Sequence, residues 1–516
     1  MTGEQLKNLI GQVMVCGFPG DSLGDQARTL IETHHVANII LFSRNVTSSW
    51  QVQKLNRDLQ SLAASSGQPL PLLICTDQEN GLVRRLSQDV PGLPGNMAVG
   101  ASHDAGLSLE TGRVTGRLLA ALGINMDLAP VLDINNNPQN PVIGVRSYGD
   151  DPREVSVMGT AMLQGLREGH VIACAKHFPG HGDTRVDSHL DLPVLNHTLK
   201  RMQEMELVPF KAAIEAGVPA LMTAHIVFEQ LDPHFPATLS PAVLTGLLRG
   251  TLGFRGMITT DCLEMNAIAQ GVGVGRGAVL ALLAGADMVM VSHHLDLQEE
   301  AIRAIEEAVD KGELPLPRLE EAASRIAQLK RAMAGAEGPE LFESAREEAQ
   351  ALQIRGSREA LTLLSDRGAS WSQPQSVALV VDGPGPRMMA AGPAAGGTGQ
   401  TVQEFLAGSQ VRLFSVPGPF DEPWIRSADW LVLVTAGQGQ PDARVLDLVN
   451  GHPHAAVLLT HTPYGMEQYA QAQRVYALYE NTPWMIRAAL AALTGRGQSL
   501  GSLPVAVGPY PRGYRA

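Results

Sequence analysis

Short apolar runs alternate with longer amphipathic stretches over the first 330 residues of the chain, and each run ends in polar residues. The eight runs are Gln12–Gly17, Asn38–Phe42, Leu70–Thr76, Ile124–Leu128, Val171–Ala175, Ala220–Ala224, Gly256–Thr260 and Ala286–Val291. Nearly continuous hydrophobic strands separated by helices are typical of a parallel sheet covered on both faces. Eight such units predict an α/β fold with a closed (β/α)8 TIM barrel, and an open doubly wound sheet is the alternative.

A second series of short apolar runs, separated by helical or Gly/Pro-rich segments, occupies the C-terminal third of the chain. Its runs are Ser376–Asp382, Val411–Val416, Trp430–Thr435, Ala455–Thr460 and Arg474–Leu478. They predict a smaller doubly wound α/β sandwich domain. We therefore expect a TIM-barrel domain over residues 1–335, a linker rich in Ala and Glu over 336–350, and the sandwich domain over 351–516 as a support for the barrel.

The composition excludes several classes of function. Lys and Arg number 39 against 52 Asp and Glu, a formal net charge of −13, which argues against nucleic acid as a partner. No run reaches the roughly 18 apolar residues of a membrane span, and the first ten residues show no signal-peptide core. The four cysteines contain no CxxC motif. We expect buried, reduced thiols and a cytoplasmic protein, whereas the oligomeric state stays unknown.

In a TIM barrel the chemistry lies in the loops that follow the strands. The residues directly after the predicted strands are strongly polar, and they include Ser43-Arg44-Asn45, Asp77-Gln78-Glu79, Lys176-His177, His225, Asp261 and Ser292-His293-His294. Solvation alone does not favour strand ends over helix faces. This pattern therefore predicts that polar and ionisable groups converge on one rim of the barrel.

The densest polar segment is Lys176–Pro193, KHFPGHGDTRVDSHLDLP, which follows the fifth predicted strand. Its glycines, Gly180 and Gly182, predict a mobile loop. One interpretation is an acid/base loop in which the Asp187 carboxylate orients the His189 imidazole. Another is a polar loop that stabilises itself by Asx turns. A third is a metal site built from some of His177, His181, Asp183, Asp187 and His189, although no recognised ligand spacing supports it.

Several motifs, in order along the chain, resemble the family 3 glycoside hydrolases that act as β-N-acetylglucosaminidases. They are NIILFSRN at 38–45, TDQENGLVRR at 76–85, VRSYG at 145–149, KHFPGHGDT followed by DSH at 176–189, ELVPF at 206–210 and GMITTDCLEM at 256–265. The resemblance covers about residues 10–330. The chain departs from the family pattern at Asn80 and Leu82, where Gly and Arg are commoner, and at Cys262, which replaces an aspartate.

The resemblance implies a role for each matching residue. Asp261 would be the nucleophile of a retaining hydrolysis that passes through a covalent glycosyl-aspartate. His189, held by Asp187, would be the acid/base. His225 and Asp127 would support the site. The residues implied in substrate binding are Asp77, Arg85, Arg146, Lys176 and His177. The resemblance implies neither a metal nor a cofactor.

The resemblance implies an exo-acting β-N-acetylglucosaminidase whose partner is a small carbohydrate, and a peptidoglycan fragment in cell-wall recycling is the expected substrate. A phosphorylase on the same scaffold is the first alternative, since a neutral imidazole does not repel a phosphate dianion. A β-glucosidase and a noncatalytic sugar-binding protein are weaker alternatives. A binding module needs neither a nucleophile nor an Asp–His pair.

Overall fold

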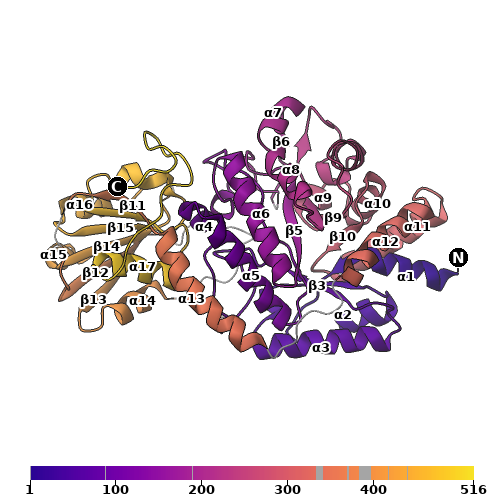
Figure 1. The fold of residues 1–516 in the computed structure, drawn as a ribbon, viewed down its shortest axis with the longest axis horizontal. Coiled ribbons are helices and arrows are strands. Elements are labelled where there is room, and N and C mark those ends of the chain that lie inside the picture. Colours follow the sequence, from indigo (N-terminus) through magenta and orange to yellow (C-terminus); the bar gives the residue numbers. More distant parts are fainter. Residues whose placement is uncertain are drawn as a thin grey trace.

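A computed structural model of the protein describes residues 2–87, 89–188, 190–332, 341–368, 371–382, 397–416, 418–437 and 440–516. Its first domain is a closed barrel of parallel strands in the order β1-β10-β9-β7-β5-β4-β3-β2 (Figure 1). The strands are β1 (Met14–Cys16), β2 (Asn38–Leu41), β3 (Leu73–Thr76), β4 (Met126–Asp127), β5 (Ile172–Phe178), β7 (Ala220–Thr223), β9 (Met257–Cys262) and β10 (Met288–Val291). Each overlaps one predicted run. The (β/α)8 barrel is therefore confirmed, and the open sheet is excluded.

Helices surround the barrel and contribute buried residues to its hydrophobic core (Figure 1). In α11, for example, Ala301, Ile302 and Ile305 are buried at helical spacing. The α-helices of this domain are α1 (Gly3–Val13), α2 (Asp25–Arg28), α3 (Ser49–Ser65), α4 (Asn96–Ser102), α5 (Ala105–Ala121), α6 (Pro152–Glu168), α7 (Leu199–Glu204), α8 (Leu207–Glu215), α9 (Asn266–Ala269), α10 (Val274–Ala284), α11 (Leu295–Asp310) and α12 (Leu316–Ala332). Within the described residues, no helix combines the length and the apolar character needed to cross a membrane.

Shorter elements complete the barrel domain. Two strands outside the barrel, β6 (Val194–Leu195) and β8 (Val227–Phe228), pair with each other. The remaining helical turns are η1 (Thr29–Thr33), η2 (Ser43–Asn45), η3 (Gly144–Arg146), η4 (Ala237–Leu239) and η5 (Ala242–Thr251). The turns η2 and η3 lie in the loops after β2 and β4, at the rim where chemistry is expected.

The second domain is built on a six-stranded sheet in the order β11-β16-β15-β14-β12-β13. Its strands are β11 (Thr362–Asp366), β12 (Ser376–Asp382), β13 (Gln410–Val416), β14 (Trp430–Thr435), β15 (Ala455–Leu459) and β16 (Arg474–Ala477). Its helices are α14 (Thr398–Phe405), α15 (Glu422–Ser427), α16 (Ala443–Gly451), η7 (Pro463–Tyr469) and α17 (Pro483–Leu493). Five strands match the predicted runs. β11 is the strand that the pattern missed, and it pairs antiparallel with β16.

The helix α13 (Phe342–Ala360) connects the two domains and differs from the linker that the composition suggested. Residues 342–350 of the expected linker form its N-terminal half, while 336–340 lie outside the described residues. Phe342, Ala345 and Ala349 are buried, and the helix packs against α5 and α4 (Figure 1). Ala and Glu are strong helix formers, so a composition rich in them is as typical of a helix as of a linker.

The two domains share apolar packing. Met97, Ala98 and Ala101 of α4, together with Val145, belong to the hydrophobic core of the second domain rather than to that of the barrel. A helix of the first domain therefore completes the core of the second.

Candidate functional site

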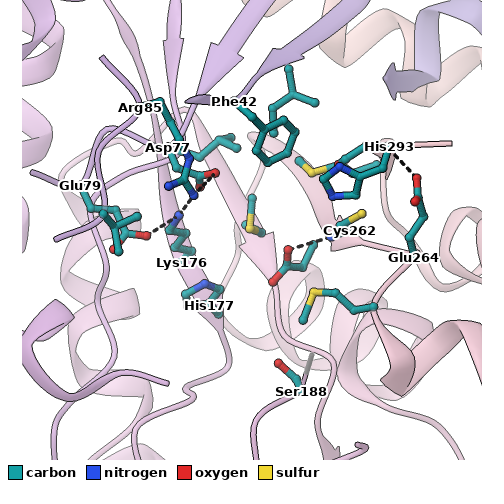
Figure 2. A pocket seen from close by; sticks show the side chains of 18 of the residues that line it. Phe42, Asp77, Glu79, Arg85, Lys176, His177, Ser188, Cys262, Glu264 and His293 are labelled. Carbon is teal, nitrogen blue, oxygen red and sulfur yellow. Dashed lines mark hydrogen bonds and ion pairs between the residues drawn. The ribbon is translucent and has the colours of Figure 1, made fainter. Parts of the chain in front are cut away.

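A pocket of about 480 Å³ lies at the carboxyl ends of the barrel strands (Figure 2). It is lined by residues at or just after the carboxyl ends of β2, β3, β5, β9 and β10, and by Arg146 of η3. The polar residues among them are Ser43, Arg44, Asp77, Glu79, Arg85, Arg146, Lys176, His177, His181, Ser188, Asp261, Glu264, Ser292, His293 and His294. The predicted convergence of polar groups on one rim is therefore present in the fold.

Lys176 lies between two carboxylates on one side of the pocket (Figure 2). Its ammonium Nζ is 2.7 Å from Asp77 Oδ1 and 2.7 Å from Glu79 Oε1, and its side chain is 2% exposed. Burial alone lowers the pKa of a lysine, but the two carboxylates raise the pKa of Lys176 above its ordinary value. For Asp77 the effect of burial has the opposite sign and raises the pKa of the carboxyl group. The positive charges of Lys176 and Arg85 outweigh burial and lower the pKa of Asp77 below the usual range. The cluster is therefore ionised at neutral pH.

Arg146 forms a bidentate salt bridge with Glu79. Its Nε and Nη2 donate to the Glu79 carboxylate at 2.8 and 2.7 Å, the geometry in which guanidinium and carboxylate bind most strongly. Burial opposes ionisation of Glu79, yet Arg146 and Lys176 hold its pKa well below the ordinary value. Arg85 Nη2 lies 3.4 Å from Asp77 Oδ2. The positions of these cations are thus fixed by buried carboxylates before any ligand arrives.

Asp133 holds the next group, His177. Its Oδ2 lies 2.6 Å from His177 Nδ1, and its carboxylate also accepts the backbone N–H groups of His177 and of His181. Burial alone raises the pKa of Asp133, but His177 lowers it below the usual range. The contact fixes the ring of His177 and leaves Nε2 near the pocket, 3.4 Å from Arg146 Nη2.

Asp261 lies at the carboxyl end of β9, partly exposed, and lines the pocket. Its Oδ1 accepts the backbone N–H of Cys262 at 2.7 Å. Burial raises the pKa of the neighbouring Cys262 thiol to about 12, so this side chain adds no charge beside Asp261 at neutral pH. His225 Nε2 contacts the Cys262 carbonyl oxygen at 3.0 Å and supports the same strand end.

The loop after β5 reaches the pocket at Ser188, whose hydroxyl lies 3.2 Å from His181 Nε2. Asp187 is buried and is not among the lining residues. His189, expected as the acid/base, lies outside the described residues. The structure thus brings six of the eight expected site residues to one pocket: Asp77, Arg85, Arg146, Lys176, His177 and Asp261.

Gly182 in this loop is required for close packing, and the mobility expected of the loop stays a prediction. A Cβ at Gly182 would lie 1.7 Å from the backbone oxygen of Ile134. Asn140 Nδ2 donates to the carbonyl oxygens of His181 and Gly182 at 2.8 and 2.9 Å. The base of the loop is therefore tied to the loop after β4.

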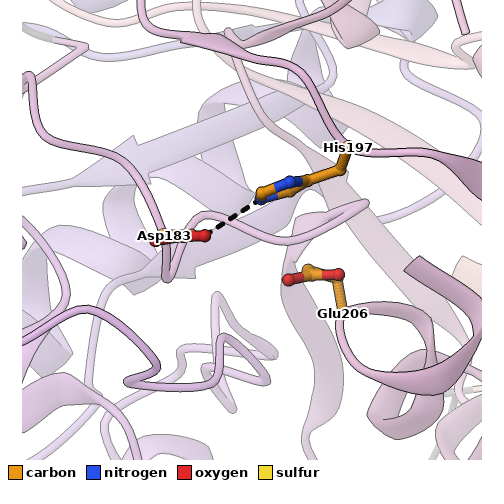
Figure 3. Close-up of side chains that lie close together, drawn as sticks. All are labelled: Asp183, His197 and Glu206. Atoms are coloured by element: carbon orange, nitrogen blue, oxygen red, sulfur yellow. Dashed lines mark ion pairs between the residues drawn. The ribbon is translucent and has the colours of Figure 1, made fainter. Parts of the chain in front are cut away.

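Three side chains in the described part of the chain, Asp183, His197 and Glu206, bring potential metal-ligand atoms within 4.8 Å of one another (Figure 3). His197 Nε2 lies 3.1 Å from Asp183 Oδ2. Arg201 Nη2 lies 3.1 Å from Glu206 Oε1 and 3.7 Å from Asp183 Oδ2. Ion pairs with a guanidinium already account for this cluster. Of the described residues in the metal interpretation, only Asp183 belongs to it.

Phe42 and His293 form the wall opposite the charged cluster, with ring centroids 5.0 Å apart (Figure 2). Arg44 Nη1 lies 2.9 Å from His293 Nδ1. Glu264 accepts the backbone N–H of His293 at 2.7 Å. This half of the pocket is less charged and more aromatic than the half around Lys176.

Sequence reasoning missed Glu79 and Asp133 as site residues. Glu79 belongs to the polar segment Asp77-Gln78-Glu79 after β3, but nothing in the sequence distinguishes it from its neighbour Gln78. Asp127 ends β4 and was the aspartate expected to support the site, whereas Asp133 lies six residues further along the chain and matches none of the motifs. In the structure Asp127 Oδ1 accepts the backbone N–H of Gln78 at 2.9 Å, and burial raises the pKa of Asp127 well above the ordinary value.

Comparison with known proteins gives consistent similarities. Residues 4–329 match the glycosyl hydrolase family 3 N-terminal domain. A beta-hexosaminidase A from Pseudoalteromonas piscicida is 34% identical over 337 residues, 61% of this chain and 56% of the relative, so this chain spans little more than half of that protein. A beta-hexosaminidase from Thiobacillus denitrificans is 36% identical over 56% of this chain and 80% of its own length. A solved family 3 beta-N-acetylglucosaminidase from a Paenibacillus species is 38% identical, with a TM-score of 0.88 over 97% of this chain and 99% of that one.

Proposed function

The chain belongs to glycosyl hydrolase family 3, and from that membership we propose that it is a retaining exo-β-N-acetylglucosaminidase. The observation that carries the proposal is the pocket itself. There the Asp261 carboxylate shares one cavity with the buried ion cluster of Asp77, Glu79, Lys176 and Arg146. A nucleophile beside fixed donors and acceptors is what glycosidic cleavage requires.

The ion cluster and His177 recognise the sugar that is removed. Asp77 accepts hydrogen bonds from ring hydroxyls, while Lys176 and His177 donate to neighbouring oxygens. Because these groups are buried and held by Glu79 and Asp133, a ligand without matching hydroxyls would leave them unsatisfied. The names of the hexosaminidase relatives support an N-acetylglucosamine residue in this subsite.

In the proposed reaction Asp261 attacks the anomeric carbon and forms a covalent glycosyl-aspartate as the glycosidic bond breaks. The protonated His189 imidazole gives its proton to the departing oxygen, and Asp187 stabilises the charged ring. Neutral His189 then takes a proton from water, whose oxygen attacks the anomeric carbon and releases Asp261. Two inversions at that carbon give net retention.

The proposed natural substrates are peptidoglycan fragments that carry a terminal N-acetylglucosamine, consumed during cell-wall recycling in the cytoplasm. All four cysteines are free and buried, which suits a reducing compartment. A small carbohydrate is the proposed partner.

Turnover of an aryl N-acetyl-β-glucosaminide tests the assignment of the nucleophile. In Asp261→Asn the amide cannot attack or form the ester, so we expect kcat to fall by about 1,000-fold or more. Asp310→Asn, which changes an exposed aspartate at the end of α11, is the matched control and should retain the wild-type rate. Equal rates in Asp261→Asn and the wild type would refute the proposed nucleophile.

Product analysis with and without phosphate separates the alternatives. We expect free N-acetylglucosamine, initially as the β-anomer, in both buffers. Sugar 1-phosphate formed in phosphate buffer would identify a phosphorylase instead. Faster turnover of aryl β-glucosides than of the N-acetyl substrate would favour a β-glucosidase. Saturable binding without turnover would favour a noncatalytic sugar-binding protein.

A further inference from the structure

The second domain contacts two barrel loops that carry proposed sugar-binding groups. Asn135 Nδ2, in the loop after β4, donates to Tyr464 Oη at 2.7 Å. At the start of η3, which carries Arg146, a methyl group on Gly144 would lie 3.6 Å from the His461 ring. The third contact, made by Glu480, reaches the loop after β3, which carries Asp77.

Glu480 is a buried carboxylate of the second domain, 1% exposed. Its Oε1 accepts from Trp484 Nε1 at 2.6 Å and from Thr482 Oγ1 at 2.9 Å, both within its own domain. Its Oε2 crosses the domain boundary and accepts the backbone N–H of Gly95 at 2.9 Å. Every oxygen of the carboxylate therefore has a donor, and one of these donors belongs to the barrel.

The backbone of the barrel loop approaches this carboxylate too closely for any side chain. A Cβ at Gly81 would lie 2.7 Å from Glu480 Oε2 and 2.7 Å from the Gly95 Cα. Gly81 also has a φ of 56°, in the region that favours glycine. The carboxylate thus lies where the two ends of the loop, near residues 81 and 95, come together.

Both ends of the loop lead directly to the ion cluster. Glu79, which holds Lys176 and Arg146, is two residues before Gly81. On the other side, Asn96 follows Gly95 and its Nδ2 donates to the Arg146 carbonyl oxygen at 2.7 Å. Displacement of the junction between Gly81 and Gly95 would therefore move Glu79 and Arg146 together.

We propose that Glu480 is a positioning residue for the sugar-binding groups, and that the second domain thereby sets the affinity of the barrel pocket for its sugar. The inference rests on the proposed function for the identity of the ligand. The described contacts of Glu480 reach the backbone beside Glu79, so its effect falls on binding rather than on the bond-breaking step.

The test compares Glu480→Gln with Tyr479→Phe. Glu480→Gln replaces one of the two acceptor oxygens by an NH2 group. In one orientation of the amide this NH2 group faces the Gly95 N–H, and in the other it faces the Trp484 N–H, so one of the two donors always loses its acceptor. Tyr479→Phe removes one buried hydrogen bond of the same domain, from Tyr479 Oη to Thr362 Oγ1, and leaves the Glu480 carboxylate in place as the acceptor for Gly95 and Trp484. Burial raises the pKa of Glu480 to about 7, so assays at about pH 8 keep the wild-type carboxylate ionised.

The first measurement needs no substrate. Hydrogen exchange at the amides of Gly81 and Gly95 should become faster by about tenfold in Glu480→Gln and remain at the wild-type rate in Tyr479→Phe. Unchanged exchange in Glu480→Gln would overturn the inference, whatever the enzyme acts on.

The second measurement uses the aryl N-acetyl-β-glucosaminide and free N-acetylglucosamine. We expect KM and the Kd of the sugar to rise about tenfold in Glu480→Gln, with kcat changed by less than about threefold. Equal rises of KM in both variants, or faster exchange with unchanged KM and Kd, would overturn the inference. Absence of turnover and sugar binding in the wild type would instead refute the proposed function, while the exchange result still decides whether Glu480 holds the loop.

Discussion

At the scale of single residues, the pocket depends on buried carboxylates that hold the proposed sugar-binding groups in place. Asp133 fixes His177, and Glu79 fixes Lys176 and Arg146. Sequence motifs identified the cations and the imidazole, because their resemblance to a family is local. They did not identify Asp133, since its role arises only when the loop after β4 folds against the end of β5.

Substitution of Asp133 by Asn should weaken sugar binding. The carboxylate is fully buried and receives three N–H groups, so an amide NH2 turned toward any of them leaves a donor without an acceptor. Such a loss corresponds to about 1–3 kcal/mol. We expect KM for the aryl N-acetyl-β-glucosaminide to rise by about tenfold or more.

Asp287→Asn is the matched control for Asp133. Asp287 is equally buried, but it lies just before β10, at the opposite end of the barrel, and pairs with Arg249, Arg318 and Arg325. Its substitution should lower the melting temperature while leaving KM near the wild-type value, because that end of a TIM barrel serves stability. A larger KM effect in Asp287→Asn than in Asp133→Asn would contradict the role given to Asp133.

Replacement of His189 by Ala should depend on the leaving group. An acid is needed most when the departing oxygen is strongly basic, so hydrolysis of alkyl glycosides should slow by about 100-fold or more. Aryl substrates with acidic phenols should slow far less in the glycosylation step. A plot of kcat/KM against leaving-group pKa measures this. Parallel lines for wild type and variant would argue against His189 as the acid.

At the scale of elements, the barrel strands could be predicted because both faces of a parallel strand are buried. Every residue of β2, β3 and β10 is buried, and this appears in the sequence as an uninterrupted apolar run. β11 escaped prediction because it is an antiparallel edge strand whose residues are only alternately buried. The close contact at Gly182 also escaped prediction, since a sequence does not distinguish glycine needed for flexibility from glycine needed for close contact.

Gly182→Ala tests that close contact. The added methyl group cannot fit 1.7 Å from the Ile134 oxygen, so the loops after β4 and β5 must separate. We expect a loss of about 2 kcal/mol or more in unfolding free energy and a lower kcat/KM, because the displaced loop carries Asp187. Chemical denaturation and steady-state kinetics measure both effects. Gly3→Ala, where a methyl group meets nothing within 4 Å, should change neither, and wild-type stability in Gly182→Ala would contradict the packing argument.

At the scale of the whole molecule, the second domain contacts the loops at the rim of the barrel. The residues that make these contacts are His461, Tyr464 and Glu480. The sequence predicted that this domain exists and located five of its six strands. It did not reveal these contacts, because they join residues more than 300 positions apart and carry no local motif.

Acidification should weaken the fold through His461. Burial lowers the pKa of this imidazole to about 4, whereas in the unfolded chain it titrates near about 6.5. Between these values the unfolded state binds more protons, so stability is fully present above about pH 6.5 and falls as the pH decreases through this window. The melting temperature of the wild type should drop more between about pH 7 and pH 5 than that of His461→Gln.

The control for that measurement is His234→Gln at an exposed position, which should keep the wild-type dependence on pH. Identical slopes for His461→Gln and the wild type would show that the buried ring contributes nothing to acid sensitivity.

The placement of α4 in the neighbouring core has a practical consequence for anyone who shortens the gene. A protein truncated after α12 would lack the second domain and would expose an apolar patch to water, formed by Met97, Ala98, Ala101 and Val145. Such a fragment should self-associate and precipitate during purification, even if its eight strands still form the closed barrel.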